Sequence, residues 1–262
     1  SSVAVSPDGT VFVVWAANQA RLSGADIFLQ RVGADGSLID QVPKNLTEVV
    51  GNLDQAQPVL SIGPDGTVFV AWLEAGVLIA TGSSDKGETF RPPAVVSEGL
   101  LSSDRPTIAA GPLADDGVSR RVYLAWEGIV STAVQNPIVY FNTGTLGASG
   151  AIVFETVVPA GSFSMVMNRQ VSPSLAWDGT SGVYLAVHEV FSGFDFGGLF
   201  LGKRFDGDTS FSSFEKIDDD AANSHGKQYP SIAVDAAGRA FAAWTDIRGG
   251  TSPNYVWFSN GE

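Results

Sequence analysis

The fold is decided by a short stretch that recurs along the chain, and its clearest copy reads Ser61-Ile62-Gly63-Pro64-Asp65-Gly66-Thr67-Val68-Phe69-Val70-Ala71-Trp72. An apolar run meets a Pro-Asp-Gly turn signal, and a β-branched run follows and ends at tryptophan. Apolar runs on either side of such a turn are typical of a β-hairpin. Close copies end at Trp15 and Trp244, and looser copies end at Trp126 and at Val187, where valine replaces tryptophan.

Each copy extends into a larger unit. The end points lie 57, 54, 61 and 57 residues apart, a spacing that suits four strands with long loops. Third strands are predicted at Asp26–Gln30, Val77–Thr81, Ile138–Phe141, Gly198–Gly202 and Tyr255–Ser259. Weaker, outer fourth strands are predicted at Ile39–Val42, Ala94–Ser97, Ile152–Thr156 and Phe214–Ile217. Because no long segment has a 3.6-residue apolar period, the chain is predicted to be all-β.

Five like units favour a β-propeller with five recognisable four-stranded blades, because radial closure protects sheet edges that would otherwise aggregate. We expect a single domain with blades at about 1–54, 55–103, 104–168, 169–226 and 227–262. A sandwich is the alternative, although it does not require five copies of one hairpin. The last unit stops after its third strand, so either that blade lacks its outer strand or an absent segment completes the ring, perhaps six-bladed.

Composition narrows the class of protein. Of the 262 residues, 44% are apolar, 16% are charged and none is cysteine, so packing alone stabilises the fold. The net charge of -13 disfavours nucleic acid as a partner, because phosphates would be repelled. No apolar run is long enough to span a bilayer, and no signal peptide opens the chain. Since residues 1–6 already read as a strand, we expect a mature, trimmed or partial form of a longer product.

One segment carries a family resemblance. It reads Ser83-Ser84-Asp85-Lys86-Gly87-Glu88-Thr89-Phe90 and resembles the Asp box, S-x-D-x-G-x-T-W, of sialidase-like propellers, also called the BNR repeat. Degenerate copies are Ala34–Ser37 and Phe205–Phe211, and Ser259–Glu262 looks like the start of another. In this family the box is structural and lies opposite the active face. The resemblance therefore implies roles in the fold for Ser83, Asp85, Gly87, Thr89 and Phe90.

The resemblance also implies what a sialidase would need. That set is an arginine triad for the substrate carboxylate, a Tyr and Glu nucleophilic pair, and an Asp acid/base. The family's early R-I-P motif is absent, and Arg105-Pro106-Thr107 is only a faint echo of it. The sequence therefore selects no catalytic residues.

Polar residues recur where strands are expected to end at the other face, after second strands and before first strands. They are Asn18, Gln19, Arg21, Gln55, Gln57, Glu74, Asp104, Arg105, Glu127, Asn168, Arg169, Gln170, His188, Glu189, His225, Lys227, Gln228, Tyr229, Asp246 and Arg248. As a ligand-binding set we take Glu74, Arg105, Glu127, Arg169, His188, Glu189, Tyr229, Asp246 and Arg248. The structural alternative is that Glu74, Glu189 and Asp246 make ion pairs between blades with Arg105, Arg169 or Lys227.

Other features have structural interpretations. The two histidines, His188 and His225, lie in different units, so no metal site is predicted. Residues 218–220 are three aspartates that offer calcium hard oxygens, but the spacing of a known loop is missing, and a solvated acidic loop is favoured. Asn45-Leu46-Thr47 is an N-glycosylation sequon. Phe194 and Phe196 pack in a blade or stack on a sugar or protein.

These observations favour a non-catalytic propeller, extracellular or at the cell surface, that binds a glycan or protein or serves as a structural module. No cofactor is expected. The alternative is a glycoside hydrolase or lyase of sialidase-like type that uses carboxylates at the loop face. A third hypothesis is assembly through an unpaired terminal strand. Fold alone does not choose among them.

Overall fold

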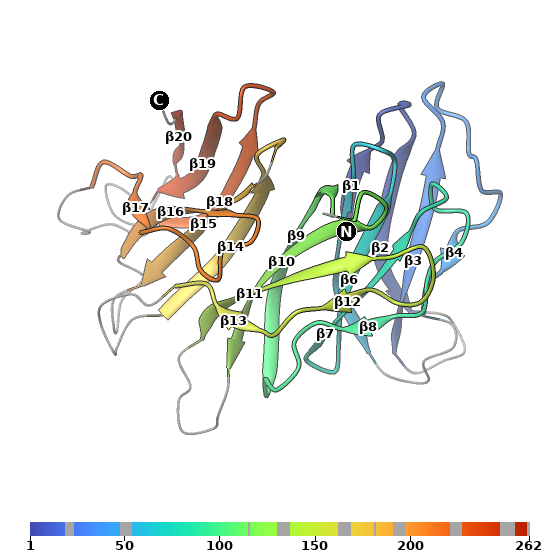
Figure 1. The fold of residues 1–262 in the computed structure, drawn as a ribbon, viewed down its shortest axis with the longest axis horizontal. Coiled ribbons are helices and arrows are strands. Elements are labelled where there is room, and N and C mark those ends of the chain that lie inside the picture. The colour runs from blue at the N-terminus through green and yellow to red at the C-terminus, as the bar shows by residue number, and fades with distance from the viewer. Residues whose placement is uncertain are drawn as a thin grey trace.

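The computed structural model describes residues 1–18, 24–47, 54–114, 116–129, 137–161, 169–180, 182–190, 197–220, 227–246 and 255–260, and for 169–170 and 255–260 it describes the backbone only. These residues form five antiparallel sheets. In four of them the strands follow one another in chain order, and Figure 1 shows the sheets succeeding one another from the N-terminus to the C-terminus. The all-β prediction is confirmed.

The strand bounds are as follows. The first sheet contains β1 (Ser2–Val5), β2 (Val11–Asn18), β3 (Ala25–Val32) and β4 (Lys44–Asn45). The second contains β5 (Gln55–Ile62), β6 (Val68–Glu74), β7 (Val77–Ser83) and β8 (Ala94–Val95). The third contains β9 (Ser102–Leu113), β10 (Arg120–Ile129), β11 (Ile138–Leu146), β12 (Val153–Phe154) and β13 (Val158–Pro159), the last two both pairing with β11. The fourth contains β14 (Arg169–Trp177), β15 (Gly182–Val190), β16 (Gly197–Phe205) and β17 (Glu215–Lys216), and the fifth contains β18 (Lys227–Val234), β19 (Ala240–Asp246) and β20 (Tyr255–Asn260).

All five predicted third strands are present, but one predicted fourth strand is wrong. The first sheet ends with β4 at Lys44–Asn45 and not at residues 39–42. Ile39 and Val42 are exposed, whereas Leu46 packs against the core and donates its N–H to Ile27 O at 2.8 Å. The apolar contact that fixes the outer strand therefore comes from Leu46 alone. The prediction chose residues 39–42 because they contain more apolar residues.

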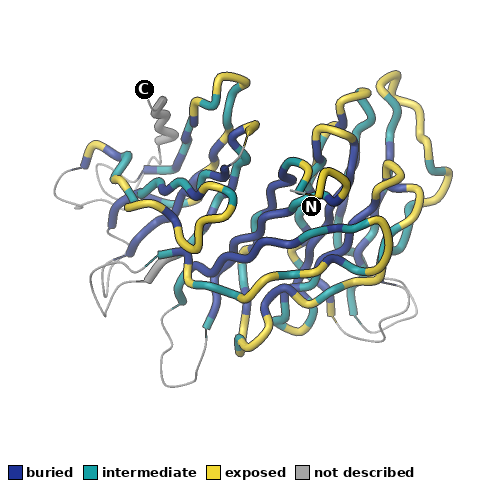
Figure 2. Tube along the Cα trace, in the orientation of Figure 1, coloured by how far each residue is buried: buried dark blue, intermediate teal, exposed yellow. Residues whose placement is uncertain are grey.

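Each pair of successive sheets encloses one apolar cluster, and buried segments follow the middle strands while exposed segments mark the turns (Figure 2). The residue at the repeat end point faces the preceding sheet. Trp72 packs against the first sheet, Trp126 against the second and Trp244 against the fourth. Val187 takes the corresponding place against the third sheet. The repeated tryptophan therefore packs one sheet onto the next.

The innermost strands β1, β5, β9, β14 and β18 are linked by side-chain hydroxyls. In each case a backbone N–H donates to a hydroxyl of the preceding sheet's inner strand. The bonds are Leu60 N to Ser2 Oγ (3.4 Å), Ala110 N to Ser61 Oγ (2.9 Å), Leu175 N to Thr107 Oγ1 (3.2 Å) and Ile232 N to Ser174 Oγ (3.1 Å). Because the inner strands are linked in this order, the sheets have the side-by-side arrangement of propeller blades.

The turn at residues 83–90, which follows β7, is closed by its own side chains. Ser83 Oγ donates to Asp85 Oδ1 at 2.7 Å, and Thr89 donates to Asp85 through both its N–H (2.9 Å) and its hydroxyl (2.6 Å). Gly87 has φ of 78°, and a Cβ there would lie 2.9 Å from Phe12. Phe90 packs on the cluster between the first two sheets. These contacts stabilise the fold, and the Asp-box interpretation itself stays a prediction.

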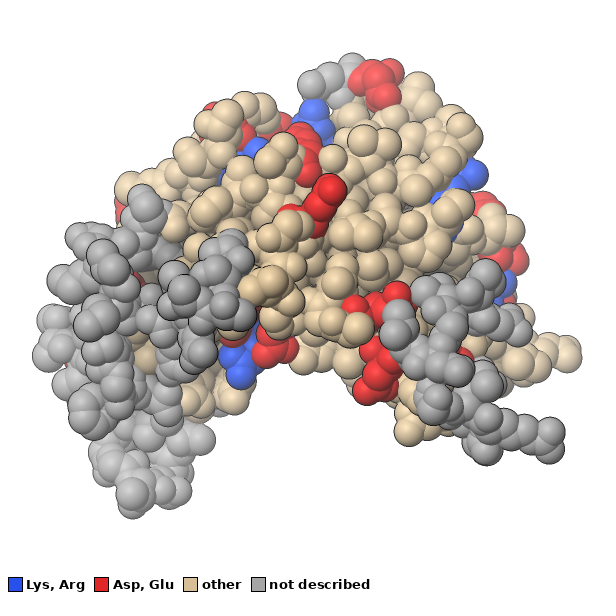
Figure 3. Space-filling model, turned by 90° about the horizontal axis from the view of Figure 1, so that it is seen from below, with Lys and Arg blue, Asp and Glu red and all other residues tan. Residues whose placement is uncertain are grey.

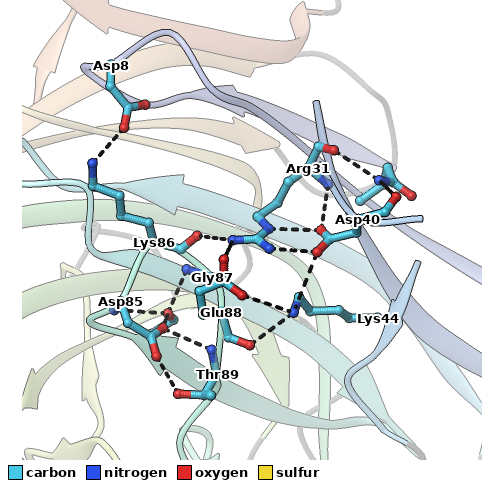
Figure 4. A network of polar contacts seen from close by, with 11 residues as sticks. Asp8, Arg31, Asp40, Lys44, Asp85, Lys86, Gly87, Glu88 and Thr89 are labelled. Carbon is cyan, nitrogen blue, oxygen red and sulfur yellow. Dashed lines mark hydrogen bonds and ion pairs between the residues drawn. The ribbon is translucent and has the colours of Figure 1, made fainter. Parts of the chain in front are cut away.

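The same turn is joined to the first sheet by a charged network (Figure 4). Arg31 donates through Nε and Nη2 to both oxygens of Asp40, at 2.8 and 2.6 Å, and through Nη1 to Glu88 Oε1 at 2.8 Å and to Lys86 O at 3.1 Å. Lys44 lies between Asp40 and Glu88. Because Arg31 is buried, these partners must compensate the hydration that its positive charge has lost.

Replacing Arg31 should therefore be costly. Arg31→Met leaves the buried Asp40 carboxylate without its bidentate partner, and we expect the free energy of unfolding to fall by about 3–5 kcal/mol in urea denaturation. Arg239→Met is the matched control, because the Arg239–Asp235 pair is exposed and should contribute less than about 1 kcal/mol. Equal losses in the two variants would contradict the role of the network.

The turn at 83–90 should also give a pH-dependent contribution. Burial raises the pKa of Asp85, but hydrogen bonds from Thr89 and Ser83 outweigh it and lower that pKa to about 2. A lowered folded-state pKa means stabilisation that is present above about pH 4 and is lost as the pH falls toward 2. We expect wild type to exceed Asp85→Asn in stability at neutral pH by less than about 1 kcal/mol, because solvent screens the exposed carboxylate. The difference should shrink as the pH falls through about 2 in urea titrations.

Candidate functional site

The inner strands share an irregularity near the ends of the second strands. Each of β5, β9, β14 and β18 shifts register against its neighbour there, as at a β-bulge. At each shift a residue with positive φ precedes a proline. These residues are Gln57 (50°), Arg105 (47°), Ser172 (54°) and Tyr229 (53°). Non-glycine residues in this region store about 1–3 kcal/mol each, and such strain concentrates at functional sites. We call these four residues the bulge residues.

Two of the bulge amides, those of Arg105 and Ser172, are bound by side chains of the preceding sheet. Gln57 Oε1 accepts the N–H of Arg105 at 2.9 Å, and its amide nitrogen donates to Asp104 at 2.6 Å. Glu127 Oε1, from β10, accepts the N–H of Ser172 at 2.7 Å. At Arg105 and Ser172, side chains of one sheet therefore hold the strained backbone of the next.

Glu127 also makes the main ion pair of this face. Arg105 Nη1 donates to Glu127 Oε1 at 2.7 Å; the carboxylate side chain is 5% exposed and the arginine side chain 47% exposed. The hydrogen bond with Glu127 outweighs burial and raises the pKa of Arg105 above its ordinary value. The buried carboxylate is therefore oriented by a cation that itself remains open to a ligand.

These groups surround a small cleft where three sheets meet. Its volume is about 160 Å³, and it is lined by Arg105, Val171, Ser172, His188, Val190, Gln228 and Tyr229. His188 is buried and Tyr229 is largely exposed. The cleft offers a guanidinium, an imidazole, a phenol and a hydroxyl beside the Arg105–Glu127 pair. We call it the rim cleft.

The structure thus brings Arg105, His188 and Tyr229 together at the cleft, with Glu127 paired to Arg105 and Glu189 next to His188 on β15. Other members of the predicted set, such as Glu74 and Asp246, lie elsewhere. Glu74 accepts a hydrogen bond from Gln55 of its own sheet at 3.1 Å, so it does not pair with Arg105. Glu189 is buried beside His188 on β15, and Asp246 is fully buried opposite Lys227 on β18. The side chain of Arg169 and the whole of Arg248 lie outside the described residues, as do His225, Phe194 and Phe196.

The predicted solvated acidic loop at 218–220 is wrong for two of its three aspartates, since only Asp219 is exposed. Asp218 and Asp220 are buried. The fully buried Lys227 ammonium lies 2.6 Å from Asp220 and 3.4 Å from Asp218, and Lys216 lies 3.3 Å from Asp218. Asp218 also accepts the N–H of Leu199 at 2.7 Å. Two lysines and a backbone amide therefore compensate these carboxylates, and the pairing of Lys227 links the fifth sheet to the fourth.

The glycosylation sequon likewise has structural contacts. Thr47 is buried, its hydroxyl accepts the Ile27 N–H at 3.1 Å, and the Asn45 amide donates to Asp26 at 2.9 Å. Among the described residues there is no group of three acidic or histidine side chains arranged to hold a metal. The same residues include no helix that could cross a membrane. Charged side chains lie singly or in small groups on the described part of the face in Figure 3.

Sequence reasoning passed over the bulges and Ser172, although a signal was present. A proline precedes the end point by 14 residues in three units, at Pro58, Pro173 and Pro230, and Pro106 takes the same place before the longer turn of the third. A proline recurring at one position marks a backbone constraint rather than a variable loop.

No family model and no curated relative matches this sequence. Solved structures do resemble it. An α-L-arabinanase from Penicillium chrysogenum, complexed with arabinobiose, has a TM-score of 0.61 at 12% identity over 97% of this chain and 78% of its own. NanB sialidase from Streptococcus pneumoniae has 0.55 at 15% over 84% and 32%, and the polysaccharide lyase Uly1 has 0.56 at 12% over 98% and 56%. At these identities the likeness establishes the fold, which is a β-propeller.

The strain at the bulges is testable at Tyr229, which is largely exposed. Glycine adopts positive φ without cost, whereas alanine does not. We therefore expect Tyr229→Gly to be more stable than Tyr229→Ala by about 1 kcal/mol in urea denaturation. The two variants remove the same phenol, so equal stabilities would show that no strain is stored at this position.

Proposed function

We propose that this chain is a glycoside hydrolase that acts on a glycan at the rim cleft, with Glu127 and Glu189 as its carboxylates. The observation that carries the proposal is the geometry of Glu127. Its buried carboxylate is fixed by Arg105 and by the strained Ser172 amide, and both of these residues line the rim cleft. Glu189 adds a second buried carboxyl from the next sheet. Glycoside hydrolysis ordinarily uses two carboxyls about 5–9.5 Å apart.

The structural neighbours support this choice of chemistry. They comprise an arabinanase, a sialidase and a polysaccharide lyase, so proteins of similar fold act on sugars. That range favours an enzyme over the non-catalytic module that the sequence favoured. An extracellular or cell-surface location remains part of the proposal, because polymeric glycans are met there.

A panel of arabinan, sialylated oligosaccharides and acidic polysaccharides, assayed for new reducing ends, tests the proposal. We expect one class to be cleaved, and we expect Glu127→Gln and Glu189→Gln each to lower the rate by about 10²–10⁴-fold, the usual contribution of a positioned acid or base. Glu74→Gln is the matched control and should keep full activity, because Glu74 pairs with Gln55 of its own sheet. Melting temperatures report whether each variant folds.

Unsaturated products absorbing in the ultraviolet would show that the glycan is cleaved by a lyase reaction and would contradict the hydrolase proposal.

The second candidate is a glycan-binding module, favoured by the fact that Glu127 is already ion-paired to Arg105. Retardation of the protein in gels containing a polysaccharide that it does not cleave would support this second function against the first.

A further inference from the structure

A second hollow lies between the third and fourth sheets, toward the opposite end of β10 from the rim cleft. Its volume is about 500 Å³, within the usual range of ligand pockets. Arg121, the second residue of β10, lines this cleft, whereas Glu127 lies six residues further along the strand. That separation is about 20 Å in a β-strand, so the two clefts are distinct. We call this hollow the distal cleft.

One wall of the distal cleft contains a buried arginine with unused hydrogen-bonding capacity. Arg204 is 8% exposed, its guanidinium carbon lies 4.8 Å from the Phe141 ring centroid, and Nη1 donates to Thr143 Oγ1 at 2.9 Å. Nη2 is 3.9 Å from Glu155, and Nε is buried without a hydrogen-bond partner in the structure. A guanidinium has five N–H donors, and an unsatisfied buried donor calls for an explanation.

Asp206, two residues after Arg204, is held by a second arginine. Arg121 Nη1 lies 2.5 Å from Asp206 Oδ2, and the Tyr123 hydroxyl donates to Asp206 Oδ1. Burial, followed by this hydrogen bond, raises the pKa of Tyr123 well above its ordinary value, so the phenol remains a donor. Asp206 is therefore oriented from two sides. Asp208 and Thr209 follow it at the exposed mouth of the cleft.

The charges of the distal cleft decide what it suits. Two arginines and three carboxylates line it, together with hydroxyl and amide side chains; the carboxylates are Glu155, Asp206 and Asp208, and the uncharged polar groups are Asn142, Thr143, Thr156 and Thr209. A simple anion would meet three carboxylates, and a cation would meet two guanidinium groups. A neutral ligand with adjacent hydroxyls would instead use both kinds, because carboxylates accept and guanidinium groups donate paired hydrogen bonds.

We propose that the distal cleft binds a neutral saccharide, as a second carbohydrate site separate from the rim cleft. The site requires no chemistry at Glu127 or Glu189. A polysaccharide chain held there would keep the protein on its polymer whether or not the rim cleft cleaves it.

The test is a titration of the ¹⁵N-labelled chain with neutral disaccharides, arabinobiose, xylobiose and cellobiose, followed by amide NMR. We expect shifts at Gly207 and Asp208 with at least one sugar. Asp208→Asn should weaken that binding by about tenfold or more, corresponding to about 1.4 kcal/mol. Glu155→Gln, at the opposite wall, is a second variant; both residues are exposed, so neither change should disturb folding.

Glu127→Gln is the matched control and should leave the shifts at Gly207 and Asp208 unchanged. Its effect on hydrolysis belongs to the rim cleft alone, so the two proposals fail separately. Shifts confined to Ser172 and Tyr229, or shifts at Gly207 only with inorganic sulfate as the probe, would overturn the saccharide proposal. So would full affinity in both Asp208→Asn and Glu155→Gln.

Discussion

The structure depends on one packing contact, in which a face of each sheet after the first packs against the sheet before it. A four-stranded antiparallel sheet that buries both faces must find a cover for each, and here the cover is the next copy of the same unit. The end-point residue supplies the contact in the second to fifth units, where it is Trp72, Trp126, Val187 and Trp244. The apolar clusters between sheets, the order of the inner strands and the positions of both clefts follow from that single packing relation.

The two clefts illustrate how a repeated frame generates unlike sites. Both occur where neighbouring sheets meet, and both use a buried or half-buried arginine beside a carboxylate. At the rim cleft, backbone strain and the Arg105–Glu127 pair direct side chains into a narrow space. At the distal cleft no non-glycine lining residue has positive φ, and Arg204 lies on an aromatic ring with its donors only partly used. The packing of neighbouring sheets is the same at both clefts, but their chemistry comes from residues that do not belong to the repeated pattern.

Much of the fold could be predicted from the sequence because hairpins are local. A Pro-Asp-Gly turn between apolar runs fixes two strands within about fourteen residues, and a β-branched run after a polar loop identifies the third. The outer strand of the first unit was misplaced because its one anchoring residue, Leu46, has no periodic neighbours. The aspartates at 218–220 were misjudged because Lys227, which compensates them, belongs to the next unit.

The site was harder to predict for the same reason. Arg105 and Glu127 were both candidates, but their pairing, and the capture of the Ser172 amide by Glu127, depend on a bulge that shifts the register of β9. Spacing along the chain does not reveal such a shift. The recurring prolines mark where along the chain the register shifts, but they do not indicate which side chains come into contact.

The hydroxyl links between inner strands have an evolutionary consequence. At each of the four junctions between successive described sheets, the earlier unit presents an acceptor hydroxyl and the later unit a backbone donor, so these junctions have the same chemistry and direction. Such a head-to-tail junction can form between neighbouring units whatever the total number of units. Recombination that adds or deletes one whole unit would leave each remaining junction with both of its partners, and lineages could therefore change the number of units without first redesigning the interfaces between them.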